Sequence, residues 1–214
     1  MDHTICFKMD LHNSDYDFSN GSSSTLDMTL DIEGDYLIIL ALSQVSITAC
    51  KINTVDQGSP VESGSAAGFY WACYIISSPT PGSSQAVQVV TSASTGLKCA
   101  FVFDTTGIIS GSTYDDSFAS DTAVGKSQTL SSSFGGSFSI VLLVDAYTPL
   151  VGGSGQQTLA GNGSYFAGGW MSSESDGTDY HYWNWGSSSL FAFYSISFEG
   201  EAPQGGRLKM SIGM

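Results

Sequence analysis

The sequence predicts an all-β fold, a two-sheet antiparallel β-sandwich of roughly nine or ten strands. Only 12% of the 214 residues are charged, whereas Ser, Thr and Gly are abundant, and helices normally need charged residues on their exposed faces. Apolar residues come in short runs that are bounded by Pro, Gly, Ser or Asp, as β-strands are. No stretch has the 3.6-residue apolar period of a capped helix, so crossover helices between parallel strands are not expected.

The first expected strand covers residues 25–32, where apolar and polar side chains alternate. This period of two predicts a strand with one buried face. A turn at 33–35 follows, and the nearly continuous apolar run 35–42 predicts a strand that is covered on both faces.

Later apolar runs predict further strands, rich in aromatic and β-branched residues. They cover residues 69–76, 86–90, 97–103, 137–146, 164–171, 179–185 and 189–199. We expect the sandwich to span residues 25–200, with an N-terminal arm at 1–24 and a C-terminal tail at 201–214. The tail carries Arg207 and Lys209, two of the six cationic residues. We interpret it as a docking segment on a protein body that is otherwise acidic.

The formal charge of −14 makes nucleic acid an unfavourable partner, because phosphate backbones are repelled. The N-terminus has neither the basic nor the apolar region of a signal peptide, so we expect synthesis in the cytoplasm of a host cell. No apolar run approaches the ~20 residues of a membrane helix, and membrane insertion is not expected. Four cysteines without a C-x-x-C pair are interpreted as small buried hydrophobes.

The order of these runs resembles a known family. GDYLIILAL is followed by FYWACYIISSPTPGSSQAVQVV, LKCAFVFDTTGI, SFSIVLLVDAY and SLFAFYSISFE. Across residues 34–199 this order resembles the jelly-roll-like, concanavalin-like β-sandwich domains of tailed-phage virion proteins, namely capsid decoration proteins, head fibres and tail-fibre modules.

The resemblance implies a non-enzymatic structural protein that is located in the virion. It implies other capsid or tail proteins as partners and a homo-oligomer, such as a trimer, because particles are built from many symmetric copies. The same architecture also hosts lectins and glucanases, so the fold alone does not assign the function.

Motifs for catalysis are weak, and we predict that the chain is not an enzyme. No Ser has Gly at both minus two and plus two, which excludes the nucleophile elbow, and a Ser-His-Asp triad could only be built on His181. Glu174, Asp176 and Asp179 resemble the E-x-D-x-x-E pattern of sandwich-fold glucanases, with Asp in place of the last Glu. A glycoside hydrolase is therefore the second alternative, against the interpretation of this segment as a solvated turn.

Calcium is the one cofactor that the sequence suggests, while the leading expectation is that there is none. Asp15, Asp17 and Ser19 occupy positions one, three and five of an EF-hand-like loop, but its glycine comes one position late and its twelfth residue is not Glu. A second acidic group could also bind a cation, and it comprises Asp115, Asp116 and Asp121. The alternative is that these aspartates lie in solvated turns.

An aromatic strand at 179–185 carries the first alternative, a carbohydrate-binding or receptor-binding module. Period two places His181, Trp183 and Trp185 on one face and Tyr180, Tyr182 and Asn184 on the other. Aromatic rings beside amides suit a sugar, so a glycan of the host surface is a candidate ligand. The candidate binding residues are Tyr180, Tyr182, Trp183, Asn184 and Trp185. The competing interpretation is that both faces are covered, by the second sheet and by a neighbouring subunit.

Overall fold

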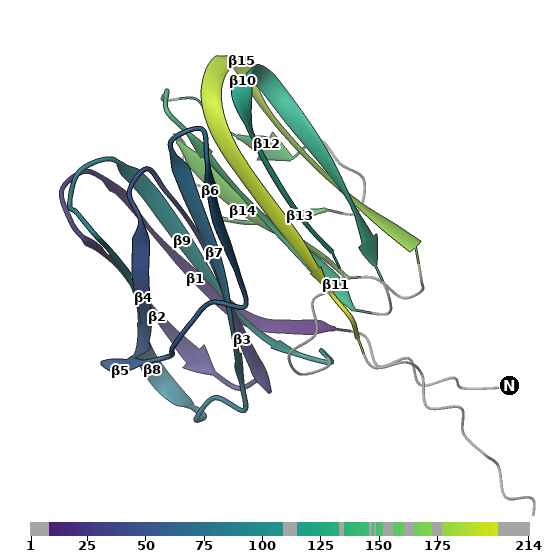
Figure 1. Ribbon diagram of the computed structural model, residues 1–214. Coiled ribbons are helices and arrows are strands. Elements are labelled where there is room, and N and C mark those ends of the chain that lie inside the picture. The colour runs from purple at the N-terminus through teal and green to yellow at the C-terminus, as the bar shows by residue number, and fades with distance from the viewer. Residues whose placement is uncertain are drawn as a thin grey trace, which may run out of the picture.

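The computed structural model describes residues 9–108, 115–132, 135–145, 147, 149–151, 156–160, 165–172 and 177–200. Within these residues the chain forms fifteen β-strands in three antiparallel sheets and no helix, which confirms the all-β sandwich class (Figure 1). The strand count exceeds the predicted nine or ten because strands such as β5 (Val55–Asp56) and β12 (Leu150–Val151) have only two residues, too few for a sequence pattern. Nothing in the described part of the chain is a helix that could span a membrane.

The first sheet has the order β2 (Thr25–Ile32), β8 (Gly82–Thr91), β4 (Ile47–Ile52) and β5 (Val55–Asp56). In β2 the predicted alternation is confirmed, since its four apolar side chains are buried and the polar ones between them are exposed. One face of this sheet therefore packs inward and the other meets solvent.

The second sheet lies in the middle of the sandwich. Its order is β1 (Asp10–Asn20), β9 (Leu97–Thr106), β3 (Tyr36–Ser43), β7 (Phe69–Ser77) and β6 (Glu62–Ala66). Every residue of β3 after Tyr36 is buried, as the continuous apolar run predicts for a strand covered on both faces.

Strand β1 lies in the segment that we expected to be part of an arm. It pairs with β9 from Asp10↔Thr106 to Asn20↔Leu97, so the sheet extends fifteen residues before the predicted boundary at residue 25. The physical reason is that Phe18 packs into the core and stacks on Phe166, with ring centroids 4.9 Å apart. Residues 1–8 and the predicted tail 201–214 lie outside the described residues.

The third sheet contains two very long strands that turn back on themselves. Its order is β10 (Asp115–Ser132), β15 (Gly177–Phe198), β11 (Gly136–Leu143), β14 (Phe166–Ser172) and β13 (Gln157–Ala160), and β12 (Leu150–Val151) pairs with β15. The register between β10 and β15 jumps from Ala123↔Ser189 to Gly125↔Asn184. At this jump both strands bend over, at the top of Figure 1.

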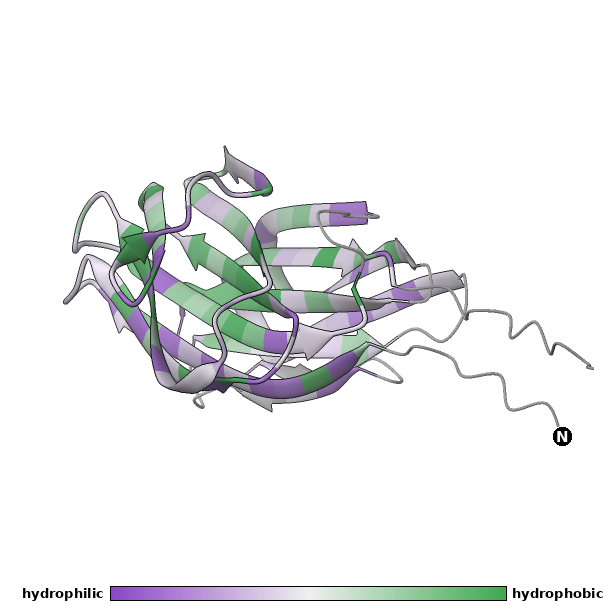
Figure 2. Ribbon diagram, turned by 90° about the horizontal axis from the view of Figure 1, so that it is seen from below, coloured by the Kyte–Doolittle hydropathy of each residue, from purple (hydrophilic) through white to green (hydrophobic). Residues whose placement is uncertain are grey.

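The bend produces a fourth layer, which we call the cover layer: residues 125–132 of β10 and 177–185 of β15. Three apolar clusters separate the four layers. One lies between the first and second sheets, the next between the second and third sheets, and the last between the third sheet and the cover layer. Figure 2 shows the stacked strands, with hydrophobic residues concentrated along those in the interior.

Both ends of the described chain lie at one pole of the body. Met9 is buried and packs directly against Gly136 of β11. A Cβ atom added to Gly136 would lie only 2.3 Å from the Cε atom of Met9. Gly136 pairs with Phe198, and Gly200 forms a bridge to Ile108. The N-terminal and C-terminal ends of the described chain therefore meet at the beginning of β11 (Figure 1).

Candidate functional site

The aromatic strand 179–185 belongs to the cover layer, and its side chains alternate as the sequence predicts. His181, Trp183 and Trp185 are buried, whereas Tyr180 and Asn184 are exposed and Tyr182 is half-buried. Tyr180 exposes 46% of its surface. The structure thus divides the five predicted carbohydrate-binding residues into an outward set of three and an inward set of two.

The two inward tryptophans are part of the core below the cover layer. Trp183 is completely buried and donates from Nε1 to the Ser139 hydroxyl at 3.1 Å. Trp185 donates from Nε1 to the carbonyl oxygen of Ala123 at 2.7 Å. Both indole N–H groups have protein partners, so these rings stabilise the packing of the cover layer and are closed to a sugar.

A buried polar cluster joins the cover layer to β11. The Ser137 hydroxyl lies 2.5 Å from Oδ2 of Asp179 and 2.8 Å from Nε2 of His181. All three side chains are buried. Burial lowers the pKa of His181 from 6.5 to about 3, so this imidazole is neutral at physiological pH.

If Asp179 is ionised, counting donors gives one arrangement of the protons in this cluster. An ionised Asp179 can only accept, so Ser137 donates its single proton to that carboxylate. The Ser137 oxygen then accepts from Nε2–H of His181, which leaves Nδ1 as the unprotonated nitrogen. Nδ1 of His181 is buried and has no hydrogen-bond partner within the described residues.

The order Asp–Ser–His differs from that of a catalytic triad. In a triad the imidazole lies between the carboxylate and the serine and takes the serine proton. Here the serine lies in the middle, between the carboxylate and the imidazole. Of the acids in the glucanase-like pattern, Asp179 is buried in this cluster, and Glu174 and Asp176 lie outside the described residues.

The predicted calcium residues of β1 make hydrogen bonds to backbone N–H groups. Oδ2 of Asp15 accepts from Thr29 N, and Oδ2 of Asp17 accepts from Asp27 N, both at 2.7 Å. Ser19 accepts from two N–H groups of the turn that follows β1. These acids therefore join the edge of the second sheet to β2, the edge of the first, and cover N–H groups that an edge strand would otherwise expose.

The second acidic group is spread along β10. Asp115 accepts from Ser131 N at 3.0 Å, and Asp121 accepts from its neighbour Thr122 N at 2.7 Å. Partial burial, and then the charge of Asp115, raise the pKa of Asp116. Among the residues that the structure describes, no group of three or more His, Cys, Asp or Glu side chains is arranged to hold a metal ion.

Two buried charged side chains have structural partners. The Lys98 ammonium donates to the carbonyl oxygens of Ser23 and Ser94 at 2.8 and 2.9 Å, and burial lowers its pKa. The Asp104 carboxylate accepts from the backbone N–H groups of Glu33 and Gly34. Each charge is thus compensated by backbone groups and stabilises a turn.

The described cysteines are free and buried, which confirms the interpretation of Cys50, Cys73 and Cys99 as small core residues. Burial, and then the nearby Asp56, raise the pKa of the Cys50 thiol to about 12. Burial raises the pKa values of Cys73 and Cys99 as well. Because the thiolate is the reactive form, none of these three thiols is a suitable nucleophile. Cys6 lies outside the described residues.

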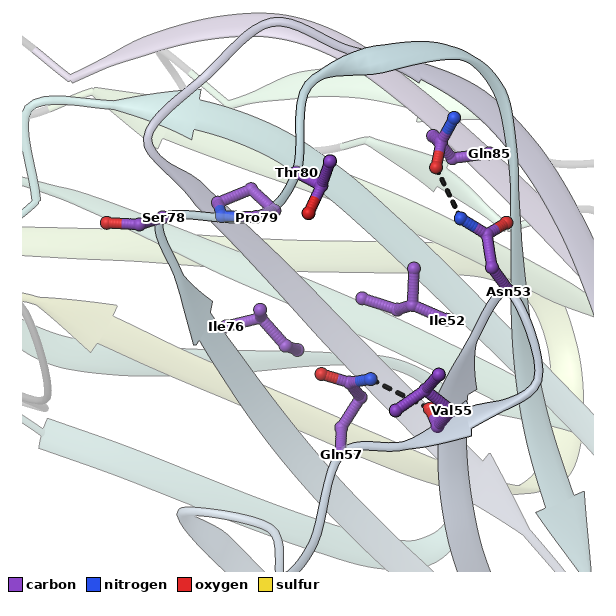
Figure 3. Close-up of a pocket in the computed structure, with 9 residues that line it drawn as sticks. All are labelled: Ile52, Asn53, Val55, Gln57, Ile76, Ser78, Pro79, Thr80 and Gln85. Carbon is purple, nitrogen blue, oxygen red and sulfur yellow. Dashed lines mark hydrogen bonds between the residues drawn. The ribbon is translucent and has the colours of Figure 1, made fainter.

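A hollow of about 290 Å³ lies at the end of the first sheet, between the β4–β5 turn and the segment after β7 (Figure 3). Its apolar lining includes Ile52, Val55 and Ile76, and its polar lining includes Asn53, Gln57, Thr80 and Gln85. No lining side chain carries a charge. Sequence reasoning missed this hollow, because it is formed by segments that are distant in the sequence.

A second hollow, of about 330 Å³, lies over the other end of β7. Its lining combines Tyr70, Trp71 and Tyr74 with the small residues Ser63 and Ser65 of β6. Trp71 stacks on Phe118 of β10, with ring centroids 4.1 Å apart, and its indole lies directly against Gly64, where a Cβ would come within 2.3 Å. This hollow is also lined by uncharged side chains only.

No protein family, curated protein or solved structure matches this chain. Its function must therefore be argued from the arrangement of its own residues.

Proposed function

We propose that this chain is a non-enzymatic structural protein of a tailed-phage virion, which decorates the capsid or forms part of a tail or fibre. The observation that carries the proposal is the position of Met9 and Gly200 at one pole of a four-layered body. Segments 1–8 and 201–214 are joined to the body there, so this pole suits attachment to a particle. The bend of β10 and β15 and the outward tyrosines would then remain available to solvent or host.

The interior supports a structural role. The cluster of Ser137, Asp179 and His181 is buried and joins two layers. Three apolar clusters hold four layers together, which makes a rigid body with few charged side chains. Such a body suits a repeated building block.

The test is the solution mass of the purified protein by light scattering, with and without a calcium chelator. We expect a closed homo-oligomer, such as a trimer, whose mass is the same in both conditions. The double variant Arg207→Glu/Lys209→Glu tests the tail as a docking segment and should weaken the oligomer. Lys126→Glu, which reverses an exposed cation of β10, is the matched control and should not. A monomer at all concentrations would contradict the assembly role.

The exposed tyrosines favour a second candidate function, carbohydrate binding at the cover layer. Tyr180, Tyr182 and Asn184 share one outward face, and rings beside an amide suit a sugar. Tyr180→Ala and Tyr182→Ala should then abolish binding to host polysaccharide without loss of stability. Unchanged binding in both variants would eliminate this face as the binding surface.

A further inference from the structure

The two hollows are floored by the same face of β7. Tyr70, Ala72 and Tyr74 line the second hollow and Ile76 lines the first, and these residues follow one another at the period of two that places side chains on one face of a strand. From Tyr70 to Ile76 this face extends about 20 Å at 3.3 Å per residue. The hollows therefore lie in line along one strand.

The segment 57–61 crosses this face between the two hollows. Gln57 donates from its backbone N to the carbonyl oxygen of Cys50 in the first sheet, and Val61 donates to that of Cys73 in the second, each at 2.8 Å. Gln57 lines the first hollow and Pro60 lines the second. The hollows exist because the first sheet ends with the two-residue strand β5 and does not cover all of β7.

Polar groups without protein partners line both hollows. In the first, the Thr80 hydroxyl and the side-chain oxygen of Gln57 have no hydrogen bond within the described residues, although the Gln57 amide nitrogen donates to Val55 O at 2.7 Å. In the second, the hydroxyls of Ser63, Ser65 and Tyr70 likewise have none there. These groups can serve a ligand without breaking bonds of the fold.

The wall of the first hollow is preorganised. The pairing of Ile52 with Val55 leaves Asn53 and Thr54 as a two-residue turn, with φ values of +48° and +73°. Asn53 accepts from Ala86 N at 3.0 Å and donates to the side-chain oxygen of Gln85 (Figure 3). A strained residue such as Thr54 persists only where its surroundings hold it, and such strain is frequent at binding sites.

We propose that this face of β7 binds a neutral oligosaccharide, with one sugar unit in each hollow. Uncharged amides and hydroxyls can bond the hydroxyls of a sugar, and the half-buried ring of Tyr70 with the half-buried side chains of Ile52 and Ile76 can contact its C–H faces. An anionic ligand is disfavoured by the net charge of −14 and by Asp56 and Glu62, which flank the lining residues in sequence. The proposal does not depend on a role in a virion.

The test is a titration of the isotope-labelled protein, followed by the chemical shifts of its backbone amides. The probes are maltotriose, cellotriose, mannotriose and N,N′,N″-triacetylchitotriose at millimolar concentration, with sialyllactose as an anionic probe. We expect at least one neutral probe to shift amides in both 52–57 and 70–80, and sialyllactose to shift neither. The absence of shifts in these segments with all four neutral probes would overturn the proposal.

Matched variants locate the site. Gln57→Ala and Tyr70→Phe each remove one polar group and should weaken binding of the responsive probe by about fivefold or more. Gln88→Ala and Tyr180→Phe are the controls, since Gln88 lies on β8 away from both hollows and Tyr180 lies on the cover layer. If Tyr180→Phe weakens binding and Tyr70→Phe does not, the sugar binds at the cover layer and the proposal fails. Thermal unfolding of each variant shows whether it is folded.

Discussion

The Ser137 hydroxyl donates a hydrogen bond of 2.5 Å to the carboxylate of Asp179, across 42 residues of sequence and from the third sheet to the cover layer. Removing this donor in Ser137→Ala leaves a buried carboxylate and a buried imidazole with one partner fewer. We expect the free energy of unfolding to fall by about 1–3 kcal/mol, because uncompensated buried polar groups are costly. Denaturant unfolding of both proteins measures this difference in free energy.

The control for this prediction is Ser127→Ala in the same layer. Ser127 is half-buried and makes no side-chain hydrogen bond within the described residues, so its loss should change stability by less than about 0.5 kcal/mol. If the two variants lose the same free energy of unfolding, the buried cluster of Ser137, Asp179 and His181 does not stabilise the protein.

His181 predicts a pH dependence of stability. Its pKa is lowered from 6.5 to about 3 by burial, so between these values the unfolded chain binds a proton that the folded chain does not. The contribution of His181 is complete above pH 6.5 and is lost as the pH falls toward 3, by at most about 1.4 kcal/mol per pH unit. Unfolding free energies measured between pH 7 and 4 should show a flatter slope for His181→Gln than for the unmodified protein.

Tyr182→Phe is the control for that comparison, because it changes the next residue of the strand and retains the buried imidazole. Its slope should match that of the unmodified protein. If His181→Gln leaves the slope unchanged, the buried neutral imidazole is not the source of the pH dependence.

Two aromatic residues of the cover layer, Trp183 and Tyr180, should differ in how much their truncation destabilises the protein. Trp183 is completely buried, and Trp183→Ala should lower the free energy of unfolding by about 3–5 kcal/mol. Tyr180 is largely exposed, and Tyr180→Ala should change it by less than about 1 kcal/mol. Thermal or denaturant unfolding of both variants measures the contrast, and similar losses would place both rings in the core.

Asp17 tests the role of the acids in β1. Its two carboxylate oxygens accept from Asp27 N and Phe18 N, so Asp17→Ala should cost about 1 kcal/mol, whereas Asp10→Ala removes no such bond. These hydrogen bonds predict that calcium leaves the melting temperature unchanged. A rise on calcium addition that is abolished in Asp17→Ala would instead support the calcium site suggested by the sequence.

Thr54→Gly should stabilise the protein, although it removes a side chain. Thr54 has a φ of +73°, which strains a β-branched residue and which glycine adopts freely. We expect a gain of about 0.5–1 kcal/mol, since an Asn-Gly turn suits this hairpin geometry. Thr29→Gly, within strand β2, should destabilise instead. If thermal unfolding shows that both Thr54→Gly and Thr29→Gly are less stable than the unmodified protein, Thr54 is not strained.

Local patterns predicted much of the fold. The alternation in β2 and the continuous run of β3 correctly indicated one and two buried faces. The cover layer could not be predicted, because residues 115–132 are mostly polar and their partners in β15 lie 45 to 82 positions away. Strand β1 was missed because its acids suggested a solvated loop, whereas they bond the backbone of β2.

Less of the candidate site was visible in the sequence. Period two separated Tyr180 and Tyr182 from Trp183 and Trp185, but both faces are aromatic, so the pattern alone could not say which face was buried. The hollows along β7 depend on where the first sheet ends, and no local pattern records that. The Asn53–Thr54 turn lines the first hollow, but the strand after it, β5, has only two residues and is too short to be predicted from the sequence.

The most direct test of the virion role is the composition of purified particles. Phage particles from a host that carries the gene can be separated on a density gradient and probed by mass spectrometry and with an antibody against this chain. We expect the chain to be present in many copies per particle and the antibody to label intact particles at the head or tail. Its absence from particles, together with its presence in the soluble fraction of the same culture, would contradict the account.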